Sequence, residues 1–178
     1  MKLTSSSVRT RYVAECASLF LLSLALTYLE TLIPFASFMP LPGFKPGLAN
    51  IVVVAAFFRL SPAASFVISL SKVAISGILF WGITTTAFSA CGALLSFITL
   101  CVLTKVFGSK IGFIGLSVSM ALAHNIGQLA CAALLMSNAS VFSYFPALSA
   151  ASLIFGSLTG AVLSSLPERI YLRKGNDT

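Results

Sequence analysis

The chain has 178 residues, of which 58% are hydrophobic and 8% charged, and its mean hydropathy is +1.02. A soluble globule needs more polar surface than these residues supply, so the composition excludes a soluble enzyme or binding domain and predicts an integral membrane protein. The net charge is +7 at pH 7, with 11 basic and 4 acidic residues.

Apolar segments separated by short polar breaks follow one another along the chain. A helix needs roughly 20 mainly apolar residues to cross about 30 Å of hydrocarbon. The segments are residues 12–33, 48–60, 62–80, 84–104, 111–136 and 146–166. The second is short, and we expect a tilted or partly broken neighbour to let it reach across. The sequence therefore predicts one all-α membrane domain, residues 1–178, with six transmembrane helices.

The basic residues indicate the orientation of these helices, because Lys and Arg concentrate in cytoplasmic loops. A cytoplasmic N-terminus places most of them on the inner side: Lys2, Arg9, Arg11, Arg59, Lys105, Lys110, Arg169, Arg173 and Lys174. Lys45 then falls outside, and Lys72 falls within the membrane. Both termini are thus predicted to be cytoplasmic. This topology accounts for the positive charge better than a nucleic-acid partner does.

The first segment, residues 12–33, follows basic residues, as the apolar part of a signal peptide does. Its length, its two glutamates and the charge alternation that its removal would spoil favour a retained helix instead. Glu15 lies four residues after Arg11, and we predict that the two side chains pair at the membrane interface.

Small residues on two helices suggest close helix packing. Ala14, Ala17 and Ser18 form a small face on the first segment, and Gly156 and Gly160 form a G-x-x-x-G pattern in the last. Small faces let helices approach closely in a membrane. Internal packing is the default interpretation of both, and docking of a separate membrane subunit is the alternative for the Ala14 face.

The connection at residues 34–46 contains four prolines among several aromatic residues. So many prolines forbid a helix, and the sequence predicts a stiff, apolar external loop. Such a loop either caps a pocket, together with Trp81 from another outer loop, or packs against lipid headgroups.

Polar side chains inside the apolar segments mark a candidate site. They are Glu30, Asn50, Lys72, His124, Asn125 and Gln128. His124 and Gln128 are four residues apart and share a helix face, whereas Asn125 lies about 100° around the helix from His124. All six are predicted at mid-membrane or on the outer side, where a protein that captures an external solute places its site.

Each of these residues also has a structural interpretation. Glu30 can extend to the outer interface, and Lys72 can be its ion-pair partner without touching a ligand. The three polar residues of the fifth segment can hydrogen-bond helices together. Their number and shared depth favour a binding site, because an unpaired charge in hydrocarbon costs several kcal/mol.

Two motifs carry a resemblance to a known family. The stretch PGFKPGLAN at residues 42–50, Lys72 in a following helix and AHNIGQ at residues 123–128 resemble the Gx transporter family, also labelled heptaprenyl diphosphate synthase component I. The resemblance extends over about residues 41–166. The family usually has an aliphatic residue before the first lysine and Leu after it, whereas this chain has Phe and Pro.

The resemblance implies a bundle similar to the substrate-binding S components of energy-coupling factor transporters, in the bacterial inner membrane. In those proteins the outer loops and outer helix halves bind a vitamin or similar molecule. A separate transmembrane coupling protein with cytoplasmic ATPases drives transport and contacts small residues of the first helix, a role that Ala14, Ala17 and Ser18 fit by position. This chain has no phosphate-binding loop, so ATP use falls to partners.

Catalysis by this chain itself is not expected. Prenyl diphosphate synthases hold Mg²⁺ through clustered aspartates, and the one aspartate here, Asp177, lies at the tail. We therefore expect no metal site, no cofactor and no enzymatic activity.

The sequence leads to one favoured function and an alternative from another class. The favoured one is a binding subunit that captures a small anionic or vitamin-like solute through these residues: Glu30, Lys45, Asn50, Lys72, Trp81, His124, Asn125 and Gln128. The two lysines would neutralise the solute and Trp81 would cover it. The alternative is a non-catalytic membrane subunit of an isoprenoid, quinone or flavin-linked electron-transfer assembly.

Overall fold

The computed structural model describes residues 5–32 and 47–167, and this part of the chain is helical, without strands. The helices are α1 (Ser5–Leu32), α2 (Asn50–Arg59), α3 (Pro62–Ser76), α4 (Ile83–Phe107), α5 (Phe113–Met136) and α6 (Phe145–Ser165). A π-helical turn, η2 (Gly77–Trp81), extends α3, and the 3-10 turns η3 (Gly108–Lys110) and η4 (Ala139–Tyr144) precede α5 and α6. The predicted all-α class is confirmed.

Five helices are long and apolar enough to cross a membrane, within the part of the chain that is described. The exception is α2, which has 10 residues. At 1.5 Å per residue such a helix covers about 15 Å, or half the hydrocarbon thickness. The predicted six spans therefore correspond to five full-length helices and one half-length helix. The loop at 34–46 and both chain ends lie outside the described residues.

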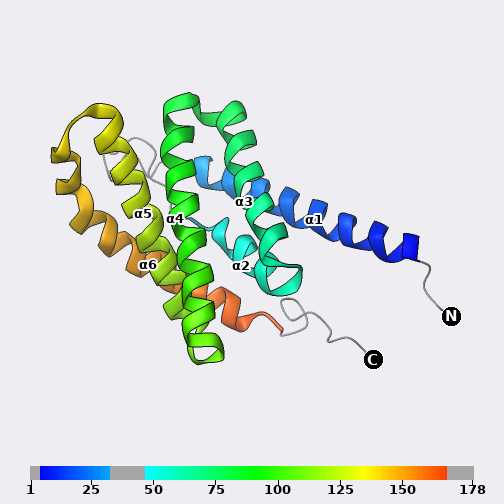
Figure 1. Ribbon diagram of the computed structural model, residues 1–178. Helices are drawn as coiled ribbons and strands as arrows, with labels where there is room; N and C mark the ends of the chain where they lie inside the picture. The colour runs from blue at the N-terminus through cyan, green and yellow to red at the C-terminus, as the bar shows by residue number, and fades with distance from the viewer. Residues whose placement is uncertain (1–4, 33–46, 168–178) are drawn as a thin grey trace.

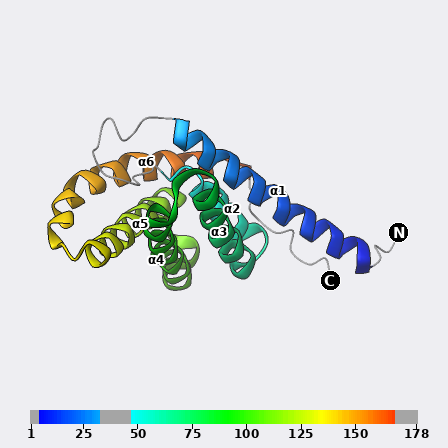
Figure 2. The ribbon, with the colours of Figure 1, turned by 90° about the horizontal axis from the view of Figure 1, so that it is seen from above.

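The short helix α2 lies inside the bundle (Figures 1 and 2). Helices α3 and α4 form an antiparallel hairpin, α5 packs on α4, and α6 packs on α5. Helix α2 contacts α1, α3 and α6. Helix α1 crosses behind α3, and its N-terminal half projects beyond the other helices (Figure 1).

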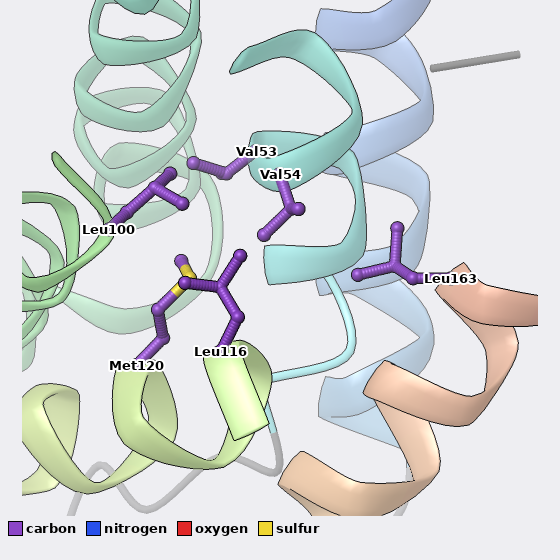
Figure 3. Close-up of a cluster of buried hydrophobic side chains, with 6 residues drawn as sticks. All are labelled: Val53, Val54, Leu100, Leu116, Met120 and Leu163. Carbon is purple, nitrogen blue, oxygen red and sulfur yellow. The ribbon is translucent and has the colours of Figure 1, made fainter. Parts of the chain in front are cut away.

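An apolar cluster surrounds α2 on the side away from α1. Figure 3 shows side chains from four helices that point toward one another: Val53, Val54, Leu100, Leu116, Met120 and Leu163. In lipid such contacts stabilise through close packing, because the surrounding chains are as apolar as the side chains. The cluster holds α2 against α4, α5 and α6.

Glycines bring neighbouring helices into close contact. A Cβ atom on Gly156 would lie 2.7 Å from Val118 Cα, and one on Gly160 would clash with the backbone at Ile114. The predicted packing role of this G-x-x-x-G pattern is thus confirmed. A Cβ on Gly92 of α4 would lie 2.8 Å from the His124 carbonyl oxygen of α5, so this glycine allows α4 to approach the turn that carries His124.

The N-terminal half of α1 carries an ion-pair cluster and an exposed small face. Glu15 lies 3.6 Å from Arg11, as predicted, and 3.3 Å from Arg59 at the end of α2. Ala14, Ala17 and Ser18 are exposed in this chain, so they do not form the internal packing surface that was the default interpretation.

Candidate functional site

Two helices turn polar faces toward the interior of the bundle. On α1 the buried residues are Ser23, Thr27 and Glu30, spaced by four and three positions. On α3 the buried polar residues follow the same periodicity: Ser65, Ser69, Lys72 and Ser76. Residues so spaced share one helix face. The outward faces of both helices are apolar, as lipid requires, and the polar faces meet inside.

The polar faces border a small open cleft of about 30 Å³. Five helices and the segment before α2 contribute its lining: Thr27, Glu30, Gly47, Ala49, Asn50, Lys72, Val73, Ser76, Ser89 and His124. Of the predicted site residues, the cleft brings together Glu30, Asn50, Lys72 and His124. They come from four different helices, so the folded bundle creates this proximity.

Glu30 holds the start of α2 in place. Its carboxylate accepts a hydrogen bond of 3.1 Å from the Ala49 backbone N–H, and Glu30 is 5% exposed. Gly47 turns the chain with φ +77°, and its carbonyl oxygen accepts from Asn50 N–H at 2.9 Å. A carboxylate at a helix N-terminus is stabilised by the unsatisfied N–H groups and by the helix dipole. The Glu30 carboxylate therefore faces the start of α2 inside the bundle.

Lys72 carries a buried positive charge. The residue is 8% exposed, and its ammonium donates to Asn50 Oδ1 at 3.5 Å, near the limit for a hydrogen bond. Glu30 acts on this ammonium as a nearby negative charge. Lys72 contributes one positive charge, Glu30 one negative charge, and the α2 N-terminus about half a positive charge. The sum is weakly positive, so these groups together favour a weakly negative ligand.

Thr27 contributes a hydroxyl that sequence reasoning missed. It is 2% exposed, and its Oγ1 has no hydrogen-bond partner among the described residues. A buried polar group left unsatisfied costs about 1–3 kcal/mol, so a solute or a water molecule in the cleft would stabilise it. Its position three residues before Glu30 is the sequence signal that identifies it. Ser76 lies four residues after Lys72, so its spacing identifies it in the same way.

Asn125 and Gln128 lie outside the residues that line this cleft. The Asn125 amide donates to Leu148 O at 3.2 Å and to Ser152 Oγ at 2.7 Å, and so joins α5 to α6. Gln128 is buried against α4, where a Cβ on Gly92 would lie 2.9 Å from its Cγ. These contacts agree with the structural interpretation of both residues, in which they hold helices together.

Two further predicted residues are not placed by the structure. Lys45 lies outside the described residues, and for Trp81 only the backbone is described, in the π-helical turn after α3. Their roles in neutralising and covering a solute stay predictions.

A family model matches most of the chain. The family model described as heptaprenyl diphosphate synthase component I covers residues 19–166. Every residue that lines the cleft falls inside this range. No curated protein and no solved structure matches the chain.

Proposed function

We propose that this chain, which belongs to the heptaprenyl diphosphate synthase component I family, is a membrane subunit that binds a small anionic solute in the cleft around Lys72. One observation carries the proposal: a buried ammonium lies beside an open cleft, and its one hydrogen bond to the described residues, to Asn50, is 3.5 Å long. A charge inside a membrane is costly, and ionisable residues there commonly mark ligand or ion sites.

An anion can accept hydrogen bonds from the remaining N–H donors of the Lys72 ammonium. Lysine has three N–H donors, of which Asn50 accepts one. Phosphate or carboxylate oxygens form short, charge-assisted bonds with the others. The Ala49 N–H and the α2 N-terminus offset the negative charge of Glu30. This supports the view that the positive charge of Lys72 attracts a solute. The Thr27 hydroxyl supplies a further donor.

The transport role is the finer part of the proposal. The chain acts as the substrate-binding component of an energy-coupling-factor-type importer, takes its solute from outside, and relies on a transmembrane coupling subunit with cytoplasmic ATPases. The two family-like motifs support this role, as does the exposed small-residue face of α1 at Ala14, Ala17 and Ser18. In this role the chain itself is not an enzyme, and it resides in the bacterial inner membrane.

The description of the family favours a second candidate. It names a component of a prenyl diphosphate synthase, which supports a non-catalytic membrane subunit of isoprenoid synthesis. In that role the partner chain performs catalysis, and the cleft binds the anionic end of a substrate or product.

Native mass spectrometry of the purified full chain tests the proposal. We expect a retained small molecule on the wild type and on Lys105→Ala, which changes an exposed lysine at the end of α4, and its loss from Lys72→Ala. Co-purifying proteins separate the two candidates: a membrane subunit with ATPases supports the importer, and a synthase chain supports the alternative. Equal retention by all three forms, or retention by none, refutes the anion site.

A further inference from the structure

Two of the four cysteines lie next to each other on neighbouring helices. Cys91 of α4 and Cys131 of α5 belong to one small cluster with Phe88, and their thiols interact directly. Both thiols are free; Cys131 is 9% exposed and Cys91 is half-buried. Neither residue lines the cleft around Lys72. The thiol pair is therefore separate from the site described above.

Close approach of the two helix backbones brings these thiols together. A Cβ atom on Gly127 would lie 2.6 Å from the Cys91 carbonyl oxygen and 2.9 Å from Gly92 Cα, so α4 and α5 nearly touch here. Cys131 lies four residues after Gly127 and shares its helix face toward α4. Phe88 lies three residues before Cys91 and packs in the same cluster. The packing of two regular helices thus determines the contact between the thiols.

The surroundings of the pair favour a covalent bond between the sulfur atoms over a metal site. Structural metal sites built from thiolates usually take four ligands, and the described residues contain no group of three His, Cys, Asp or Glu side chains that could hold a metal. A disulfide needs only the two sulfur atoms and carries no charge, which suits a position between two membrane-spanning helices. Thiols in contact on closely packed backbones are near the separation that a disulfide requires.

The side of the helices next to the pair faces lipid. Leu94 lies three residues after Cys91 and is 40% exposed, and Leu134 lies three residues after Cys131 and is 80% exposed. Both helices are long and apolar enough to cross a membrane. A reagent that reaches these thiols from the side must therefore dissolve in lipid.

We propose that Cys91 and Cys131 form a dithiol site that a lipid-soluble quinone oxidises to a disulfide. In this reaction both S–H bonds break and one S–S bond forms. The two electrons and two protons pass to the quinone, which becomes a hydroquinone. The disulfide joins α4 to α5 close to two residues that line the cleft, Ser89 and His124. The site does not depend on whether a solute binds at Lys72.

Oxidation of the reduced full chain in phosphatidylcholine nanodiscs by decylbenzoquinone tests this site. We expect the intact mass to fall by about 2 Da, through loss of two hydrogen atoms, as one hydroquinone forms per chain. Peptide mapping should show Cys91 linked to Cys131. The unfolding temperature of the oxidised chain should rise by at least about 5 °C, because the bond constrains the unfolded state.

Single substitutions separate this pair from the other two cysteines. Cys91→Ala and Cys131→Ala should each abolish the loss of mass and the rise in unfolding temperature. Cys16→Ala and Cys101→Ala are the matched controls and should behave as the wild type, since both residues are also partly buried in helices. Peptide mapping of the wild type identifies the linked residues even where a variant does not fold.

Three results would overturn the proposal. The first is an unchanged mass, or a gain equal to the mass of the quinone, which means addition to a single thiol. The second is a disulfide that involves Cys16 or Cys101. The third is a Cys91–Cys131 disulfide that forms with the water-soluble oxidant diamide but not with the quinone, which contradicts oxidation from the lipid.

Discussion

Replacing Lys72 by Met distinguishes a ligand-binding lysine from a structural one. Met is similar in length and carries no charge. If Lys72 and Glu30 were a structural ion pair, removing one partner would strand the other charge and cost about 3–5 kcal/mol. If the Lys72 ammonium instead binds a solute, the solute-free protein tolerates the removal of this ammonium.

The contacts in the cleft give the stability change expected if Lys72 binds a solute. A lysine at the centre of a membrane helix costs about 2.5–3.5 kcal/mol, which Met does not. The substitution also removes the hydrogen bond to Asn50, and at 3.5 Å this bond lies toward the weak end of the about 1.5–3 kcal/mol range for charged groups. Glu30 keeps its bond to Ala49. The free energy of unfolding should therefore stay equal or rise by up to about 2 kcal/mol.

Equilibrium unfolding of the solute-free protein in mild detergent measures this difference, and solute binding is measured on the same samples. We expect unchanged or increased stability together with a loss of affinity of at least about 100-fold, the equivalent of about 2.7 kcal/mol. A stability loss of about 3 kcal/mol or more, with solute binding retained, would refute the reasoning and make Lys72 a structural partner of Glu30.

Three further substitutions test other parts of the account. Thr27→Val should stabilise the empty protein by about 1 kcal/mol and weaken solute binding, whereas Ser96→Ala should leave binding unchanged, as unfolding and calorimetry will report. Asn125→Ala should cost about 1–2 kcal/mol of stability and leave binding within about threefold; a loss of binding in a stable variant would contradict its interhelical role. Gly160→Ala should lower the unfolding temperature because its Cβ meets the Ile114 backbone, while Gly115→Ala, whose Cβ has 3.7 Å to its nearest neighbour, should not.

The helices were predictable because lipid imposes long apolar runs. The segment predicted at 84–104 is α4, Ile83–Phe107, and the one at 111–136 is α5, Phe113–Met136. The shortness of α2 was predicted too, since the segment at 48–60 already stood out as short. Its start differs by two positions, because it depends on a carboxylate 19 residues away in sequence. Apolar residues before Asn50 made the segment look longer than the helix that Glu30 caps.

The site was only partly predictable for a related reason. His124 and Asn125 are neighbours in sequence, and periodicity alone places them on different faces without saying which face meets the cleft. That choice follows from α4 packing at Gly92 and α6 packing at Gly156 and Gly160, which are tertiary contacts. Thr27, by contrast, was accessible from its spacing to Glu30 and was missed because a single threonine in a membrane helix attracts little notice.

A ligand-bound structure of the purified chain tests the central claim most directly. The account predicts a solute whose anionic oxygens lie within about 3 Å of both Lys72 Nζ and Thr27 Oγ1, with Glu30 still bonded to the Ala49 N–H. An ammonium bonded directly to the Glu30 carboxylate, with only water in the cleft, would contradict it.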